Sequence, residues 1–388
     1  MIGGAVLLAA SRWIPAADDK RPVILAIDAE FGVPAATSAQ AIQRGAEIAA
    51  AEINAAGGVL PGRSLEIAIR NNNSMPARAR DNLTELAAHP DVVAVMSGKH
   101  SPVAQQLIPL IHELGMPYLV PWAAADDITD NRHQPNFVFR LSLRDSWAMA
   151  ALIGRAEARG YRRLGLLIPN NGWGRSNLAA IEGQLAGSKR LALVSRQSYN
   201  MGHPYLHEQY EALLKDRADV VILVGNELEG VAVVEEISGH LPADRLPVLS
   251  HWGVTGGEFF ERTGDALKKV DFSVVQTYSF IDAKGERVRR IVEQLRARWG
   301  VASAREIDSP VGVAQAYDLT HLLALAVRQA GSTDRAAVRA ALEQIPEYAG
   351  LIRHYRRPFT PARHDALDAS QVFVARYAPD GAIVRVAK

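Results

Sequence analysis

The sequence contains no cysteine and has almost no excess charge of either sign. Without a thiol the chain can form no disulfide, no cysteine metal cluster, no thiol nucleophile and no lipid-modified N-terminal cysteine. Its 43 Lys and Arg residues balance 42 Asp and Glu residues, for a net charge of +1. A chain without a basic surplus has no long-range attraction for nucleic acid, so we expect no nucleic acid partner.

The common catalytic motifs are missing as well. There is no G-x-S-x-G nucleophile elbow, no H-E-x-x-H zinc motif and no phosphate-binding loop. The first predicted strand ends in DAEFG, where a dinucleotide-binding fold would carry its glycine turn. His203 and His207 are four residues apart, but Pro204 separates them and no nearby carboxylate completes a metal set, which favours a surface pair. Asp126 and Asp127 read as caps of a turn. We therefore expect no enzyme, no cofactor and no metal site.

The N-terminal run GGAVLLAASRWIPAA is apolar and then rich in small residues. It is too short to span a bilayer, which takes about 20 residues. It resembles the hydrophobic region and cleavage zone of a secretory signal, although the basic start is missing. We expect residues 1–21 to be a signal or N-terminal tail, and the protein to be exported, soluble and periplasmic.

The rest of the 388 residues is too long for one core, and it alternates between strand and helix patterns. PVILAIDAEF (22–31) and DVVAVMSG (91–98) read as strands, and the stretches between and after them have helical spacing. A second such series runs to VDFSVVQTYSF (270–280), after which three helices and some short strands follow. This order predicts an α/β protein with two doubly wound parallel units. Neither Gly/Ser nor Pro enrichment marks a linker near residue 140, so we expect a direct crossover there.

Polar and aromatic residues follow many of these strands, at the edge where open α/β sheets bind ligands. The stretch SGKHSPVAQQL (97–107) is one example. Ser101 followed by Pro102 predicts a helix start with Ser101 as the N-cap, and the free N–H groups and dipole of that end attract anions. The other strand-end residues are Asp28, Glu30, Phe31, Lys99, His100, Trp122, Ala123, Ala124, Asn171, Trp173, Asn226, Glu227, His251 and Trp252. We expect the three tryptophans among them to be exposed.

Several longer stretches resemble one family. GAEIAAAEINAAGGVLPGRSLEI (45–67), NNNSMPARARDN (71–82), the block 91–129 and AQAYDLTHLLALAVRQAGSTDRAAVRAALEQI (314–345) are similar, in order, to type I periplasmic binding proteins of the branched-chain amino acid (Leu/Ile/Val-binding) class. The resemblance implies two lobes joined by three crossovers that close over a small ligand like a Venus flytrap. It implies lobe one at 22–140 plus 281–352, and lobe two at 141–280 plus 353–388.

The resemblance also implies roles for site residues. Ser101 and the amides after it would hold a ligand carboxylate, and Trp173 would take the place of a tyrosine that closes on the ligand. Ala124, Asn226 and Trp252 depart from the residues usual in amino acid binders, so the set that recognises an amine is largely gone. Glu227, Asp126 or Glu30 could replace it.

We expect a small carboxylate or amide, with an aromatic or apolar body stacked by tryptophans. The predicted ligand contacts are Glu30, Phe31, His100, Ser101, Pro102, Trp122, Ala123, Ala124, Trp173, Asn226, Glu227 and Trp252.

Two functions fit these expectations. The first is an extracytoplasmic solute-binding protein, monomeric, that delivers its ligand to the permease and ATPase of an ABC importer. The second is a ligand-sensing module of the same fold that regulates a membrane-bound kinase, cyclase or receptor. The absence of any recognisable signalling domain favours the first.

Overall fold

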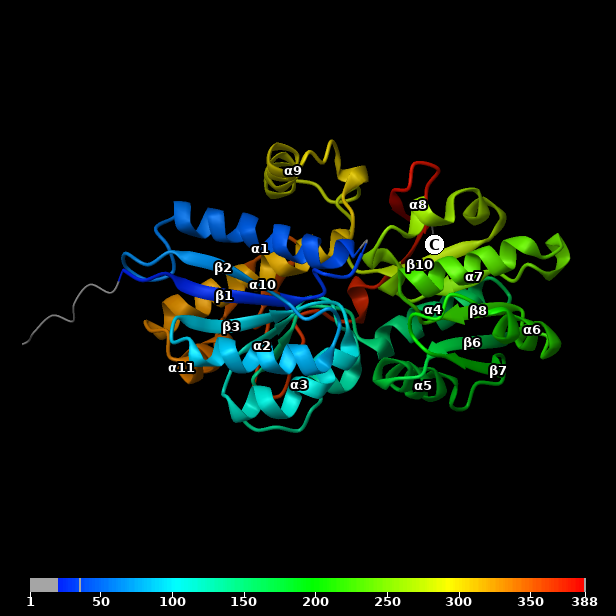
Figure 1. Ribbon diagram of the computed structural model, residues 1–388, viewed down its shortest axis with the longest axis horizontal. Coiled ribbons are helices and arrows are strands. Elements are labelled where there is room, and N and C mark those ends of the chain that lie inside the picture. The colour runs from blue at the N-terminus through cyan, green and yellow to red at the C-terminus, as the bar shows by residue number, and fades with distance from the viewer. Residues whose placement is uncertain (1–19, 35, 387–388) are drawn as a thin grey trace, which may run out of the picture.

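The computed structural model describes residues 20–34 and 36–386, and it forms two α/β lobes side by side (Figure 1). The predicted secretory segment 1–21 lies outside these residues except for its last two. In the part of the chain that is described, no helix is long and apolar enough to cross a membrane.

The first lobe is built on a five-stranded sheet in the order β2-β1-β3-β4-β5, with every pair parallel. Its strands are β1 (Val23–Ala29), β2 (Leu65–Asn71), β3 (Val92–Ser97), β4 (Tyr118–Val120) and β5 (Val138–Arg140). The helices α2 (Pro76–Ala88) and α3 (Ser101–Glu113) bury one face of the sheet in an apolar core that includes Leu83, Val95 and Leu107. The helices α1 (Thr37–Ala55), α10 (Pro310–Ala330) and α11 (Arg335–Leu342) pack together elsewhere in the same lobe, α1 against α10 and α10 against α11.

The second lobe holds a seven-stranded sheet in the order β14-β13-β10-β9-β8-β6-β7. Its strands are β6 (Arg163–Pro169), β7 (Ala192–Tyr199), β8 (Val220–Leu223), β9 (Val248–Ser250), β10 (Phe272–Gln276), β13 (Phe373–Tyr377) and β14 (Ile383–Arg385). Its helices are α4 (Asp145–Ala158), α5 (Gly172–Leu185), α6 (His207–Lys215), α7 (Glu227–Gly239) and the short α8 (Phe259–Thr263). The predicted α/β class with two parallel sheets is confirmed, and the C-terminal strands β13 and β14 add an antiparallel edge.

The remaining elements lie between or beside the lobes. They are α9 (Glu286–Trp299), the hairpin of β11 (Glu347–Ala349) and β12 (His354–Arg356), and short 3-10 turns that include η1 (Asp126–Ile128) and η3 (Trp252–Gly256). The lobe boundaries stay a prediction. The contacts of 354–365 favour a last crossover later than 353, because His364 bonds the Val138 carbonyl and Asp365 bridges to Arg140, both in the first lobe.

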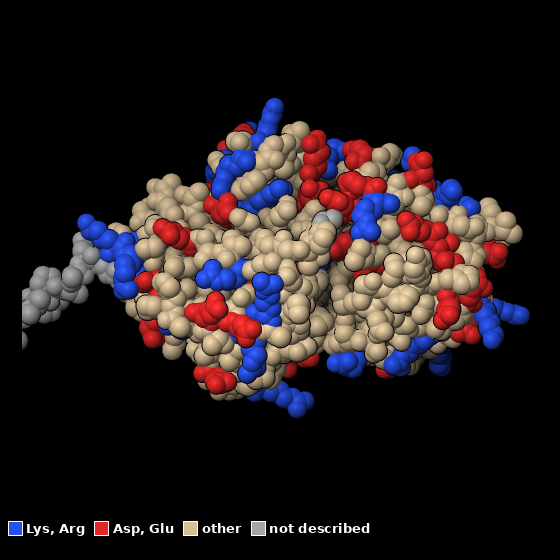
Figure 2. Space-filling model, in the orientation of Figure 1, with Lys and Arg blue, Asp and Glu red and all other residues tan. Residues whose placement is uncertain are grey.

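A continuous apolar core runs from α1 and α10 of the first lobe into the second lobe, and it includes Trp122 and Trp252. Outside this core, acidic and basic side chains are interspersed over the face drawn in Figure 2. Positive and negative charges are therefore mixed over this face and are not gathered into patches of one sign.

Candidate functional site

The loops after β3 and β4 of the first lobe meet the loops after β8 and β9 of the second. An ion pair joins them, because the Lys99 Nζ lies 2.6 Å from the Glu227 Oε2, and the side chains are 1% and 5% exposed. Lys99 also donates to the Gly256 carbonyl at 3.2 Å. A Cβ at Gly256 would stand 2.9 Å from the Lys99 Cδ, so a larger residue there would have to displace the lysine side chain. Burial alone would raise the pKa of Glu227, but Lys99 more than offsets this and holds that pKa below its ordinary value.

Glu30, which follows β1, holds the loop that contains Lys99. Its carboxylate accepts hydrogen bonds from the Ser38 hydroxyl at 2.6 Å and from the Lys99 backbone N–H at 3.3 Å. His100 next to it is half-buried, and burial lowers the pKa of its imidazole. Phe31 and Pro102, also predicted contacts, are only partly buried. Glu30 therefore positions Lys99.

The three tryptophans come together at the lobe boundary, and the expectation that they are exposed is wrong. Trp122 and Trp252 are each 1% exposed and Trp173 is 6% exposed. The Trp122 and Trp252 rings have centroids 5.5 Å apart. A Cβ at Gly253 would lie 2.8 Å from the Trp173 ring, which shows how tightly this ring is packed. Each lobe supplies part of the apolar surface that covers the other lobe's rings.

Asp145 is a buried group at this boundary that sequence reasoning missed. Its Oδ1 accepts a bond from the Trp173 Nε1 at 3.1 Å and lies 3.0 Å from the His251 Nε2. Asp145 and His251 are completely buried, and the His251 ring lies edge-on to Trp173 at 5.1 Å. In the sequence, Asp145 resembles an ordinary acidic residue of a first helical turn, because its partners are distant along the chain, Trp173 at the start of α5 and His251 after β9.

Ser101 does not cap its helix. Helix α3 begins at Ser101 itself, with Pro102 in the first turn, and no side chain caps this end. The Ser101 Oγ instead accepts bonds from the backbone N–H groups of Ala124 at 3.1 Å and Ala125 at 3.2 Å. A hydroxyl that accepts two bonds still has its own proton to donate. The predicted contacts Ser101 and Ala124 are thus neighbours, with Ala123 fully buried beside them.

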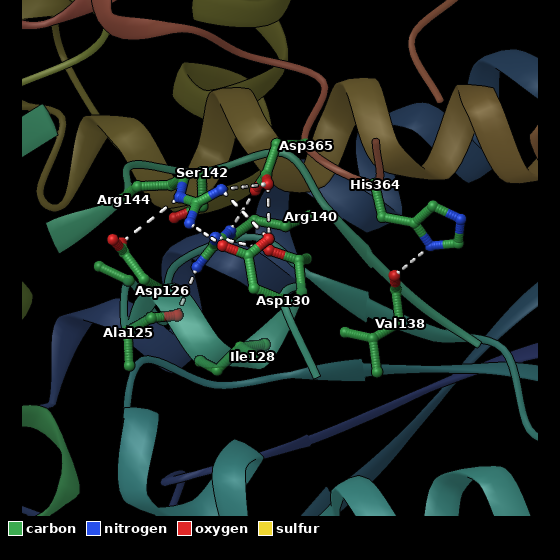
Figure 3. A network of polar contacts seen from close by, with 12 residues as sticks. Ala125, Asp126, Ile128, Asp130, Val138, Arg140, Ser142, Arg144, His364 and Asp365 are labelled. Atoms are coloured by element: carbon green, nitrogen blue, oxygen red, sulfur yellow. Dashed lines mark hydrogen bonds and ion pairs between the residues drawn. The ribbon is translucent and has the colours of Figure 1, made fainter. Parts of the chain in front are cut away.

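A charged network behind β5 fixes the loop that contains these amides (Figure 3). Arg140 donates to the Ala125 carbonyl at 2.7 Å and pairs with Asp365, and its side chain is completely buried. Arg144 joins Asp126, Asp130 and Asp365. Burial alone would raise the pKa of Asp365, but the two arginines hold it below its ordinary value. This network went unnoticed in the sequence because Asp365 lies 225 residues after its partner Arg140.

Further contacts hold the lobes together in this structure. The Asp126 N–H donates to the Ser176 hydroxyl at 3.1 Å, and the Ser309 hydroxyl donates to the Thr255 carbonyl at 2.8 Å. Asn226, predicted to contact ligand, caps α7 in a capping box with Glu229. The cleft is thus closed and filled by the protein's own side chains around Trp122.

A cavity of about 560 Å³ opens between α3, η1 and α5. Its lining includes Gln105, Asp126 and Asp127 of the first lobe and Gly172, Arg175 and Ser176 of the second. None of the twelve predicted contact residues lines it.

The sequence over residues 29–382 matches the family model for periplasmic binding proteins, so the chain belongs to that family of small-molecule binding proteins. The membership agrees with the expectation that the protein is a binding protein rather than an enzyme. No curated protein matches the sequence.

Solved structures of this family share the fold. A type 1 periplasmic binding protein from Bordetella pertussis Tohama I superposes with a TM-score of 0.83 at 20% identity, covering 94% of this chain and 100% of that chain. The branched-chain amino acid substrate-binding protein LivJ of Streptococcus pneumoniae, in complex with isoleucine, gives 0.75 at 18%, covering 93% and 97%. An ABC transporter solute-binding protein of Rhodopseudomonas palustris HaA2, in complex with p-hydroxybenzoic acid, gives 0.79 at 16%, covering 95% and 96%. At these identities the likeness establishes the fold but not the Leu/Ile/Val specificity.

Proposed function

We propose that the chain is the periplasmic solute-binding component of an ABC importer, and that its ligand is a small carboxylate without an ammonium group. The observation that carries the proposal is the buried ion pair between Lys99 and Glu227. Glu227 is the acidic side chain that reaches this pair from the second lobe, and the protein's own ammonium group already neutralises it.

An amino acid ligand would bring a second ammonium group to the same carboxylate. It would have to displace Lys99, and an unpaired buried charge costs about 3–5 kcal/mol. A plain carboxylate avoids this conflict and finds two suitable partners in the first lobe, the Ser101 hydroxyl and the positive N-terminal end of α3. Lys99 adds a further positive charge next to that end. The charges of the site therefore select against a free ammonium group.

The apolar part of the ligand would lie against the tryptophans. Trp122 and Trp252 present aromatic faces from opposite lobes, which suits a flat ring better than a short aliphatic chain. Fold relatives are recorded with both kinds of ligand, isoleucine in one case and p-hydroxybenzoic acid in another. For this chain we infer an aromatic carboxylate, admitted when the lobes separate and retained when they close.

Isothermal titration calorimetry with benzoate, 4-hydroxybenzoate, leucine and isoleucine tests the ligand class. We expect binding of at least one aromatic carboxylate and none of the amino acids. Ser101→Ala should weaken carboxylate binding by about 1–3 kcal/mol if the hydroxyl donates to the ligand. Tight leucine binding without any carboxylate binding would overturn the proposal.

The role in import needs a separate experiment. Deleting the gene should abolish high-affinity uptake of the carboxylate by intact cells, and uptake should return with the full-length chain. Unchanged uptake, together with loss of a transcriptional or chemotactic response, would point instead to the sensing role.

A further inference from the structure

Two helices at the outer end of the second lobe present a cluster of histidine and glutamate side chains. Helices α6 and α7 pack side by side there (Figure 1). His207 and Glu211 lie one turn apart on α6, and Glu236 and His240 lie one turn apart at the end of α7. Residues four apart on a helix share one face, so each helix offers a His–Glu pair.

The ligand atoms of these side chains converge. The Glu236 Oε1 lies 2.9 Å from the His207 Nδ1 and 2.9 Å from the His240 Nε2. The Glu211 Oε1 lies 3.7 Å from the His240 Nε2. Four ligands at about 2.0–2.1 Å from a tetrahedral zinc ion are separated from each other by about 3.3 Å. These three separations bracket that value, and one ligand atom each from His207, Glu211 and His240 lies within 4.8 Å of the other two. Side-chain rotations would bring these atoms and the neighbouring Glu236 carboxylate around one ion.

The surroundings keep the cluster in place and accessible. The Tyr210 ring packs edge-on against the His240 ring at 5.0 Å. The Tyr210 hydroxyl donates to the Asp244 carbonyl at 2.6 Å and accepts from the Leu246 N–H at 2.9 Å. The side chains of His240 and Glu236 are 19% and 20% exposed, whereas that of His207 is 65% exposed. One side of the cluster is thus fixed by packing and the other is open to an incoming ion.

The charges also suit a cation. Three carboxylates, those of Glu208, Glu211 and Glu236, place negative charge around His207. Two carboxylates and two neutral imidazoles together balance a divalent ion. Nitrogen and oxygen donors of this kind suit zinc or a neighbouring transition metal and not calcium, which prefers oxygen ligands alone.

We propose that His207, Glu211, Glu236 and His240 form a binding site for a divalent transition-metal ion, with Zn²⁺ the best match. The ion fastens α6 to α7 at the end of the lobe farthest from the cleft. The proposal does not depend on the identity of the cleft ligand. In the sequence the histidine closest to His207 is His203, whereas Glu236 and His240 belong to the next helix and Glu211 lies one turn further along α6.

Titration calorimetry with ZnCl₂ in a non-chelating buffer tests the site on the full chain. We expect one equivalent to bind to the wild type, and EDTA to reverse the binding. Loss of a residue that only hydrogen-bonds a metal ligand weakens metal affinity about 10–100-fold. His207→Ala and Glu211→Gln remove direct ligands, so each should weaken Zn²⁺ affinity by at least about 100-fold. Both side chains are half exposed or more, so both variants should fold.

His203→Ala is the matched control, since this exposed histidine bonds within its own turn, at the Tyr205 carbonyl. It should bind Zn²⁺ as the wild type does. The melting temperature should rise with Zn²⁺ in the wild type and in His203→Ala, but not in His207→Ala. No binding to the wild type, or equal binding to the wild type and all three variants, would overturn the proposal.

Discussion

Replacing Glu227 with glutamine should open the cleft without unfolding either lobe. The substitution keeps the size of the side chain and an oxygen acceptor, but it leaves the Lys99 ammonium without its counter-charge. Lys99 is 1% exposed, so solvent cannot replace that charge while the lobes are closed. Removing one partner of a buried pair costs about 3–5 kcal/mol, and the retained acceptor favours the lower end. At about 1.4 kcal/mol per factor of ten, about 3 kcal/mol shifts the ratio of closed to open molecules by more than about 100-fold.

The cost falls on closure because the pair joins two lobes. Lys99 follows β3 of the first lobe and Glu227 begins α7 of the second. Once the lobes separate, both groups reach water and the glutamine variant carries no penalty. The loss of stability against urea is therefore limited to the free energy by which closure is favoured in the wild type.

Small-angle X-ray scattering of the ligand-free proteins is the assay. The radius of gyration of Glu227→Gln should exceed that of the wild type, and Lys99→Met should behave in the same way. Glu182→Gln is the control, because its pair with Arg196 lies in the second lobe with side chains more than half exposed and is expected to matter little. Identical scattering curves for the wild type and Glu227→Gln would refute the reasoning.

Three further outcomes follow from the same contacts. Ser101→Ala removes the acceptor of two loop amides and should lower the free energy of unfolding by about 1–3 kcal/mol in a urea titration; an unchanged midpoint would mean that water replaces the hydroxyl. Asp365→Asn leaves the buried Arg140 without its charge partner and should cost about 3–5 kcal/mol in the same titration, and a loss below about 1 kcal/mol would contradict that. The pKa of Glu227 is lowered in the closed state from 4.5, so its contribution to closure is complete above that pH and is lost as the pH falls through the lower value. Scattering should then show opening only below about pH 4.5, and opening between pH 6 and 8 would exclude Glu227 as the cause.

The sheets could be predicted from sequence because their signals are local. A short apolar run indicates a strand, as in DVVAVMSG. Apolar residues spaced three to four apart indicate a helix, as in the stretch after Ser101. The rule that ligands bind at the carboxyl ends of parallel strands then brought Lys99, Trp122, Glu227 and Trp252 to one place. The structure joins them as two pairs across the lobe boundary, Lys99 with Glu227 and Trp122 with Trp252.

The predictions that were wrong concern residues whose contacts join distant parts of the chain. The exposure of Trp122 is decided by Trp252, which another lobe supplies, so no local pattern reports it. Ser101 looked like an N-cap because Ser-Pro commonly starts helices, but the loop after β4 offers two amides that compete for the same oxygen. The contact of His207 with Glu236 could not be read from the sequence for the same reason, since the two residues are 29 positions apart.

The contacts that hold the cleft closed should lower the apparent affinity for ligand. A ligand drives closure only through a difference in affinity between the two states. Here Trp122 packs on Trp252 and Lys99 on Glu227 across the lobe boundary, so these contacts compete with a ligand for the same surfaces. Apparent affinity then falls with the fraction of molecules that is open and competent to bind.

Glu227→Gln should therefore bind an aromatic carboxylate more tightly than the wild type. The largest expected gain in affinity from easier opening equals one divided by the fraction of wild-type molecules that are open. Its lobes open more easily, and Lys99 becomes free to pair with the ligand carboxylate. Calorimetry separates this from the alternative in which Glu227 itself holds the ligand, because the variant would then bind more weakly. Tighter binding together with a larger ligand-free radius would identify the ion pair as the contact that holds the ligand-free lobes together.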